Sequence, residues 1–354
     1  MTTSCNVLIL LPLAVLHLLL LLGASAANLN GGNVIDRCWR GQRNWAADRQ
    51  RLAVCSVGFA GKMRQNRGPG VVSYTVTDPS DDPVRPRPGT LRYGATLLPS
   101  ASNRSSTWIT FARDMHIRLA QPLYVRSFTA IDGRGADVHV AGGGAGIVLY
   151  HVRGVIVHGL HVHDVRAQPP GPVVVPGGDV VRPTGAGDGD AIRLVASAKV
   201  WIDHNTLSRC EDGLVDVTGG STDVTVSNNW IRHGYAHVVN NLYEGWRDYA
   251  IGGSMGPSVK SQGNLFAASG GAGDNKKVTR RMPAVARVGA AGKAAGNWHS
   301  VGDAFENGAF FKQVGNRVRP NYNRHQAFPA ASSGEVRSLT SGVGALRCLV
   351  TAAC

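Results

Sequence analysis

The chain has 354 residues, of which 45 are glycine and only 6% are aromatic, so short strands and turns are favoured over long helices in one large or two small domains. Lys and Arg outnumber Asp and Glu by 37 to 23, a formal net charge of +14, which indicates a polyanionic partner. Charge alone fits a nucleic acid or an acidic polysaccharide, but the absence of zinc-finger spacing, a basic zipper and an aromatic-rich RNA signature argues against nucleic acid.

The N-terminus has the pattern of a secretory signal. Residues 7–22 are almost wholly apolar and lead into the small residues Ala24 and Ala26. We therefore predict that residues 1–26 are a signal peptide and that the mature protein is secreted. A retained membrane anchor is the alternative, because the first residues contain no Lys or Arg. No later stretch is long and apolar enough to cross a bilayer, so we expect no membrane association after cleavage.

Export to an oxidising compartment favours disulfides. Cys38 and Cys55 flank an amphipathic segment, and we predict that they form a disulfide that clamps a helix around residues 45–54. Cys348 and Cys354 would close a small loop at the C-terminus. Cys210 is then unpaired, because Cys5 is removed with the signal peptide.

The mature chain changes character near residue 108. Residues 27–107 are predicted to form an N-terminal cap region and loops, which include the N-glycosylation sequon at Asn103. Residues 108–354 are a run of short apolar segments separated by Gly, Asn and Asp, which is typical of stacked coils.

Four of these segments align on one asparagine column. They are VWIDHNTL, VTVSNNWI, AHVVNNLY and VKSQGNLF, and the column is Asn205, Asn229, Asn241 and Asn264. A large apolar residue follows two positions later in each. We predict that the asparagines hydrogen-bond along the solenoid axis and that the apolar column fills the core.

The spacing of the asparagine column breaks once. Asn205 and Asn229 are 24 residues apart and Asn241 and Asn264 are 23 apart, but Asn229 and Asn241 are only 12 apart. A complete coil does not fit in half its usual length. The periodicity therefore breaks between Arg232 and Tyr235.

Residues 188–216 bring acidic side chains next to short apolar runs. The acidic positions are Asp188, Asp190, Asp203, Asp212 and Asp216. Two clusters of carboxylates suit a hard cation such as Ca²⁺. Acidic residues and glycines at strand ends are equally typical of solvated turns, so spacing alone leaves both interpretations open.

The motifs GDGDAI, VWIDH and DGLVD, in this order and spacing, resemble those of the plant pectate lyases. The resemblance covers nearly the whole mature chain and includes VIDRCWR, FARDM, AIDGRG, VIVHGLHVHD and SLTSGVGALRC. It implies an all-β fold, a right-handed parallel β-helix with a small N-terminal disulfide-clamped helical cap. It also implies calcium-dependent β-elimination of (1→4)-α-D-galacturonan, or pectate, to unsaturated oligogalacturonates by a cell-wall enzyme that we expect to be monomeric. The implied calcium ligands are Asp188, Asp190, Asp212 and Asp216, with Asp188 either a direct or an outer ligand.

The chain departs from the family pattern after His233. An HDK segment, a further strand and an arginine-rich RMPRxR segment are expected before GYAHVVNN, so about forty residues, nearly two coils, are missing. The arginine-rich segment supplies the catalytic base in the family, and the catalytic residue of this chain is therefore unassigned. The similar Arg280-Arg281-Met282-Pro283 comes too late in the strand order to replace it. Two alternatives follow: a catalytically inactive pectate- and calcium-binding cell-wall protein, or an incomplete gene model.

The histidines of the VIVHGLHVHD motif suggest a second metal site. His161 and His163 are two apart, and such residues on a strand face the same side and can bind zinc. The matching stretch of the family is structural, as is the segment around Trp201. We therefore expect His151, His158, His161 and His163 to be structural.

Overall fold

The computed structural model describes residues 33–98, 105–183, 187, 189–231, 237–246, 249–253, 258–271, 276–281, 297–318, 327–344 and 348–349. The chain divides into two units, Met1–Gly32 and Asn33–Cys354. The predicted signal peptide, Asn103, Asp188 and Cys354 lie outside the described residues. No helix in the described part of the chain has the length and apolar character needed to span a membrane.

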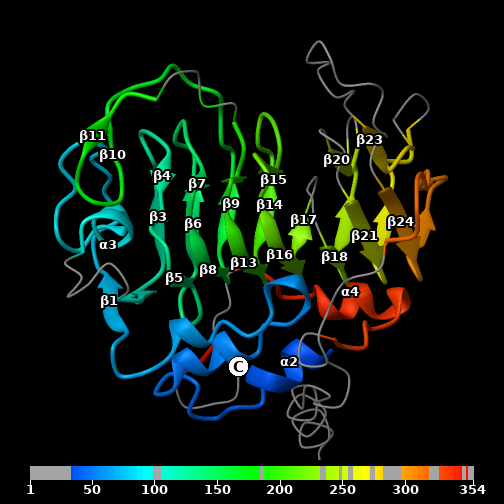
Figure 1. Ribbon diagram of the computed structural model, residues 1–354, viewed down its shortest axis with the longest axis horizontal. Coiled ribbons are helices and arrows are strands. Elements are labelled where there is room, and N and C mark those ends of the chain that lie inside the picture. Colours follow the sequence, from blue (N-terminus) through cyan, green and yellow to red (C-terminus); the bar gives the residue numbers. More distant parts are fainter. Residues whose placement is uncertain are drawn as a thin grey trace, which may run out of the picture. The chain divides into compact units, whose positions relative to one another are not determined.

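The second unit is a parallel β-helix in which successive coils lie side by side in chain order (Figure 1). A nine-stranded sheet contains β1 (Val72–Val76), β2 (Thr107–Phe111), β5 (Thr129–Asp132), β8 (Arg153–His158), β13 (Ala198–Asp203), β16 (Thr222–Ser227), β18 (His237–Val239), β21 (Ser258–Gln262) and β24 (Asn297–Val301). An eight-stranded sheet contains β3 (Met115–Ile117), β6 (Val138–Ala141), β9 (His161–His163), β14 (Thr206–Ser208), β17 (Trp230–Ile231), β19 (Leu242–Glu244), β22 (Leu265–Ala267) and β25 (Ala304–Glu306).

The remaining parallel strands form two separate groups. One is a four-stranded sheet, β4 (Leu123–Tyr124), β7 (Ile147–Tyr150), β12 (Ile192–Val195) and β15 (Val215–Thr218), and the other pairs β20 (Ile251–Gly253) with β23 (Thr279–Arg281). A short antiparallel hairpin joins β10 (Val173–Val174) and β11 (Val180–Val181). The predicted all-β parallel β-helix is confirmed. The first strand, β1, belongs to the stretch 27–107, which was predicted to be a cap region and loops, and it pairs with β2 as the first strand of the nine-stranded sheet.

The asparagine ladder holds neighbouring coils together in the interior. The Asn205 Nδ2 donates to Asn229 Oδ1 at 3.0 Å, and the Asn241 Nδ2 donates to Asn264 Oδ1 at 3.0 Å. The Asn229 backbone N–H donates to Asn241 Oδ1 at 3.2 Å, which carries the ladder across the twelve-residue step. The ladder extends to Asp303, which accepts from Asn264 Nδ2 at 3.0 Å and which the sequence pattern did not reveal. All four asparagine side chains are buried. Buried amides need hydrogen-bond partners, and the ladder supplies them.

The twelve-residue step leaves two sheets continuous. Strand β16 pairs with β18, where Thr225 opposes His237, and β17 pairs with β19, where Trp230 opposes Leu242. Residues 232–236 between β17 and β18 lie outside the described residues. In the described part of the chain the four-stranded sheet ends at β15, and strands of that type resume only at β20 (Figure 1). Among its described residues, this step therefore adds one strand to each of two sheets and none to the third.

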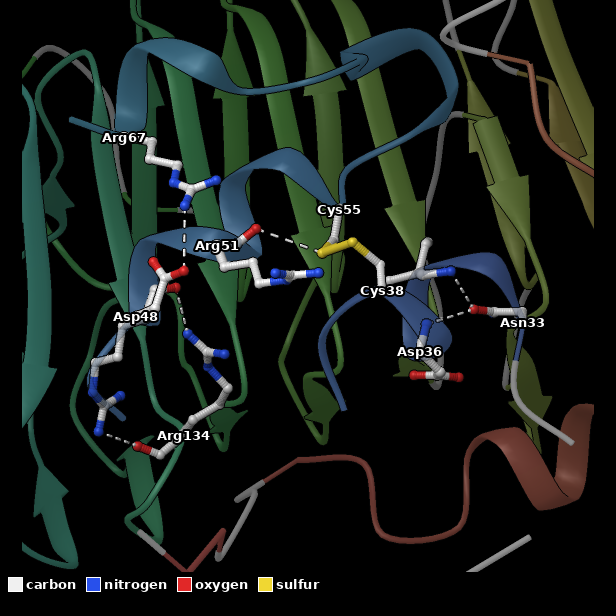
Figure 2. Close-up of a disulfide and its surroundings, with 10 residues drawn as sticks. Asn33, Asp36, Cys38, Asp48, Arg51, Cys55, Arg67 and Arg134 are labelled. Atoms are coloured by element: carbon white, nitrogen blue, oxygen red, sulfur yellow. Dashed lines mark hydrogen bonds and ion pairs between the residues drawn. A yellow bond between two sulfur atoms is a disulfide. The ribbon is translucent and has the colours of Figure 1, made fainter. Parts of the chain in front are cut away.

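The N-terminal cap covers the outer face of the nine-stranded sheet. It contains α2 (Val34–Trp39) and the 3₁₀ helices η2 (Arg49–Val54), η3 (Gly58–Ala60) and η4 (Arg64–Asn66). The predicted helix at 45–54 is wrong in type and extent, because only Arg49–Val54 is helical and it is 3₁₀. The α-helix lies earlier and begins at Asn33, whose side chain accepts from the N–H groups of Ile35 and Asp36. The disulfide Cys38–Cys55 joins the two helical segments (Figure 2).

The cap buries an apolar column and a charged cluster. Trp108, Ala130, Ile156 and Trp201 oppose one another across β2, β5, β8 and β13 and pack with Trp39 of the cap. Beside them Asp203 contacts His158 at 3.0 Å and His204 at 2.7 Å. His204 also contacts Asp36 of α2 at 2.9 Å, so the ion pairs tie the cap to the coils. His158 and Trp201 are structural, as expected.

Two further helical segments lie outside the cap. Helix α3 (Leu91–Thr96) sits in the stretch that was predicted to be loop, and its buried Arg92 is paired with Asp81 at 2.7 Å. The 3₁₀ helix η5 (Ser333–Glu335) leads into α4 (Val336–Leu339) near the C-terminus. Cys348 is in a disulfide, but its predicted partner Cys354 is among the residues not described. Cys210 is free, and burial raises the pKa of its thiol to about 12.

Candidate functional site

Three of the four predicted calcium ligands meet at one edge of the four-stranded sheet. Asp190 lies two residues before β12, Asp212 lies in the turn before β15, and Asp216 is the second residue of β15. The two turns are joined by backbone hydrogen bonds, from Ala191 N–H to Gly213 O at 3.0 Å and from Asp212 N–H to Gly189 O at 3.4 Å. Asp188, the fourth candidate, lies outside the described residues.

Two glycines let these turns approach each other. A Cβ on Gly213 would lie 2.5 Å from Oδ1 of Asp190, and a Cβ on Gly189 would lie 2.8 Å from Cβ of Glu211. Gly189 also has a φ of 96°, a conformation that favours glycine. The GDG and DGL motifs therefore have a steric role, because they allow the Asp190 carboxylate to sit against the following turn.

Asp216 has a cationic neighbour that the sequence motifs did not reveal. Arg193 of β12 opposes Asp216 of β15, and its Nε lies 3.6 Å from Oδ2 of Asp216. Both side chains are about one-third exposed. The alternation of Ile192 and Leu194 with Arg193 was the available signal, because it places Arg193 on the outward face three residues after Asp190.

Residues beyond the interrupted sheet lie close to the same carboxylates. Burial raises the pKa of the Tyr249 phenol, and the negative charges of Asp212, Asp216 and Asp190 add to this effect. Tyr249 precedes β20, and the Arg280 guanidinium of β23 lies 5.5 Å from the centre of its ring. The fold thus places Arg280, which the strand order seemed to separate from the site, beside Tyr249, a residue that the acidic edge influences electrostatically.

A groove of about 750 Å³ adjoins this edge. It runs over the outward face of β4, β7 and β12, where Tyr124, Tyr150 and Arg193 line it, and Asp190 borders it. The segment that carries β10 and β11 forms the facing wall with Val175, Val181 and several prolines. Aromatic and apolar surface with a few convergent charges is the usual lining of a binding groove.

The chain is similar to curated enzymes over most of its length. It is 39% identical to Pectate lyase 1 of Chamaecyparis obtusa, with 91% of this chain and 94% of the relative covered. It is 40% identical to Probable pectate lyase 4 of Arabidopsis thaliana, with 91% and 90% covered. No protein-family model matches the chain. The chain belongs to the pectate lyase family.

Two solved structures have the same fold. The crystal structure of Jun a 1, the major allergen from cedar pollen, superimposes with a TM-score of 0.71 at 38% identity, with 88% of this chain and 99% of that chain covered. A pectate lyase from Bacillus sp. N165 in complex with trigalacturonate has a TM-score of 0.50 at 17% identity, which shows the fold alone.

The alignment to the Chamaecyparis pectate lyase is longer than the chain itself. It extends over 364 positions, although 91% of 354 residues is only about 322, so about forty positions of the relative have no counterpart here. A pectate lyase of this family therefore carries more residues within the aligned region than this chain does.

The donor set of the acidic edge fits calcium by its chemistry. Asp190, Asp212 and Asp216 offer only carboxylate oxygens, which hard divalent cations prefer. Among the described residues, the groups of three Asp and His ligands whose ligand atoms all lie within 4.8 Å of one another are Asp137–His139–His161 and His158–Asp203–His204, and the acidic edge is not one of them. The edge is an open arrangement, in which further oxygens must complete a coordination shell of six to eight.

Proposed function

We propose that the protein is a secreted pectate lyase that binds de-esterified homogalacturonan along the groove and cleaves it by calcium-dependent β-elimination. The observation that carries this proposal is the oxygen-only acidic edge beside the groove, in a chain that belongs to the pectate lyase family. Asp190, Asp212 and Asp216 would hold the ion, with Asp188 beside them. Bound calcium supplies a positive charge that holds a uronate carboxylate and acidifies the proton on carbon 5.

The groove residues have roles that do not depend on the ion. Arg193 presents a guanidinium at the groove surface, and Arg126 lines the same wall. Guanidinium groups bind carboxylates through paired hydrogen bonds, so they can hold successive uronates of a polyanion. The exposed ring of Tyr150 offers a flat apolar surface against which a sugar ring can pack. The +14 charge of the chain favours encounter with such a polymer.

The interruption of the four-stranded sheet favours a second function, that of a pectate-binding protein with little catalysis. The base of the family belongs to a segment between β17 and β18 for which this chain has no matching residues. Binding substrate and transition state equally well does not accelerate the chemical step. We therefore expect this chain to bind pectate and calcium while turning it over slowly.

Calorimetry separates binding from turnover. Calcium should bind to the purified protein in the presence of polygalacturonate, and elimination is followed by the ultraviolet absorbance of unsaturated uronates. Binding with slow turnover supports the pectate-binding function. Turnover at the rate normal for the family would support the full lyase, and absence of both would contradict the proposal.

The incomplete gene model is tested at the transcript. Sequencing across the codons for His233 and Gly234 shows whether the mature message carries further coils. A continuous message supports the chain as written, and an insertion of about forty codons would restore the family pattern. Peptide mapping of the secreted protein tests the signal cleavage after Ala26 and the glycosylation of Asn103, and light scattering tests the expected monomer.

A further inference from the structure

A column of histidines stands on the outer face of the eight-stranded sheet, away from the acidic edge. His116 of β3, His139 of β6 and His161 of β9 oppose one another in register. Their rings stack with centroid distances of 4.2 Å and 4.5 Å. The sequence pattern paired His161 with His163 on one strand, whereas the fold pairs it with a histidine 22 residues earlier on the neighbouring coil. Stacking of coils, not spacing within a strand, gathers these side chains.

One carboxylate joins two members of this column. The Oδ1 of Asp137, just before β6, lies 2.9 Å from Nε2 of His139 and 3.9 Å from Nε2 of His161. The ligand atoms of the three residues all lie within 4.8 Å of one another. Their side chains are 21–25% exposed, so an ion can reach them from solvent.

A relay of hydrogen bonds orients His139. Nδ1 of His163 lies 2.6 Å from Oδ2 of Asp164, which the Arg209 guanidinium holds at 2.7 Å. His163 therefore donates to this carboxylate from Nδ1, and its Nε2 accepts from Nδ1 of His139 at 2.8 Å. Nε2 of His139 faces Oδ1 of Asp137 at 2.9 Å, and the two atoms can share either a proton or a cation. A carboxylate–histidine relay of this kind is how metal-ligating histidines are usually held.

We propose that Asp137, His139 and His161 form a surface site for a divalent transition metal of the Zn²⁺ or Cu²⁺ class. Two imidazoles and one carboxylate are ligands that these metals prefer, whereas calcium prefers oxygen alone. The rings of His139 and His161 are nearly parallel, at 8°, so the partly exposed His161 ring rotates to direct its lone pair at the ion. A solvent water completes the coordination. The site is separate from the acidic edge and links the coils of β6 and β9.

Zinc titration of the metal-free full-length chain tests the site. The protein that is titrated carries Asp212→Ala and Asp216→Ala, so that zinc cannot bind two of the carboxylates proposed for calcium. Calorimetry is run with Zn²⁺ alone in a non-coordinating buffer near pH 7.5. One site is expected, together with a rise in Tm on adding zinc, because an ion that binds only the folded state stabilises it. Co²⁺ in place of zinc should give visible absorption bands of a nitrogen- and oxygen-ligated ion.

Substitutions on the column separate ligands from neighbours. His139→Gln and His161→Gln should each weaken zinc binding at least tenfold. Asp164→Asn, which breaks the relay without removing a ligand, should weaken it about tenfold to a hundredfold. His116→Gln is the matched control, because His116 stacks on His139 but is not one of the three ligands, and it should leave the affinity within about twofold. Equal Tm values of the metal-free variants show that each is folded.

Two results would overturn the proposal. One is the absence of zinc binding by the folded chain. The other is an affinity that survives both His139→Gln and His161→Gln, or that falls as much in His116→Gln as in the ligand variants, because zinc would then bind elsewhere.

Discussion

Arg193 and Asp216 stand at equivalent positions of neighbouring strands, and their pairing has consequences for the acidic edge. The guanidinium lies 3.6 Å from the carboxylate, so it competes with a metal ion for one of three candidate ligands. It also faces the groove, where it can bind a uronate. These two roles oppose each other, and substitution can separate them.

Arg193→Gln should therefore have opposite effects with and without polymer. Without polygalacturonate, calcium affinity should rise several-fold because a competing positive charge is removed. With polygalacturonate, polymer affinity should fall, and its salt dependence should weaken, because a groove cation is lost. Calorimetry and binding isotherms at two salt concentrations measure both. The control is Arg153→Gln, which changes an exposed arginine of β8 on another sheet. If Arg153→Gln changed calcium and polymer affinity as much as Arg193→Gln, neither role could be assigned to Arg193.

The carboxylates themselves are tested by a double variant. Asp212→Ala/Asp216→Ala should abolish calcium binding measured with polygalacturonate, because a divalent ion with too few anionic ligands binds weakly. Asp223→Ala changes an exposed aspartate of β16 and should leave calcium binding unchanged. Retained binding in the double variant would show that calcium is held elsewhere.

His204 makes the stability of the cap dependent on pH. Burial lowers the pKa of His204, but Asp203 and Asp36 outweigh it and raise the pKa to about 8, against an ordinary value of 6.5. The folded state therefore binds this proton more tightly than the unfolded state. The stability that results is complete below pH 6.5 and is lost as pH rises through about 8. The pKa of His158 shifts in the opposite direction, since burial lowers it to about 4. The contribution of neutral His158 to stability is therefore lost as pH falls from 6.5 towards 4.

Denaturant unfolding between pH 6.5 and 8.5 measures the His204 contribution. The free energy of unfolding should fall by about 1.5 kcal/mol over this range, and the fall should be much smaller in His204→Gln. The exposed His151 provides the control variant His151→Gln, which should retain the full slope. An unchanged slope in His204→Gln would show that another group titrates.

At the scale of elements, the cap depends on its disulfide. Cys38 and Cys55 enclose a sequence separation of 17 residues, and the cap they join buries the outer face of four strands. Replacing both by serine should lower the stability by about 3 kcal/mol, since a loop of this length constrains the unfolded chain by that amount. Chemical denaturation measures the loss, and Cys210→Ala, which changes no disulfide, should have a smaller effect. Equal losses in the two proteins would argue against a clamping role.

The elements also show what could be predicted from the sequence. The asparagine ladder was predicted correctly, because each coil repeats the same buried position. The predicted break between Arg232 and Tyr235 lies outside the described residues. Helix α2 was missed, because six residues are too few to establish a helical periodicity and its buried face packs on strands far along the chain. Arg193, Tyr249 and the column of His139 and His161 became visible only when coils were stacked, since their partners lie 20 or more residues away.

At the scale of the whole molecule, we propose that the interruption of one sheet separates binding from catalysis. The interior ladder and two sheets continue across the twelve-residue step, so the β-helix persists. In the described part of the chain, the sheet that bears the acidic edge ends at β15, and β20 and β23 form a separate pair. Tyr249, which precedes β20, lies within electrostatic reach of the carboxylates, and Arg280 packs on its ring. On our proposal, a fold with this arrangement keeps the binding surface, while the segment that carries the base in the family pattern has no match in this chain.

The rate of β-elimination by purified protein of confirmed mass tests this account most directly. Polygalacturonate and calcium are supplied, and the ultraviolet absorbance of unsaturated uronates is followed beside an intact member of the family. We predict a rate lower by about a hundredfold to ten-thousandfold, the usual contribution of a positioned base, with calcium-dependent polymer binding retained. A rate equal to that of the intact relative would contradict the account, and would mean that another residue has become the base, with Arg280, followed by Arg232 and Arg281, the first to substitute.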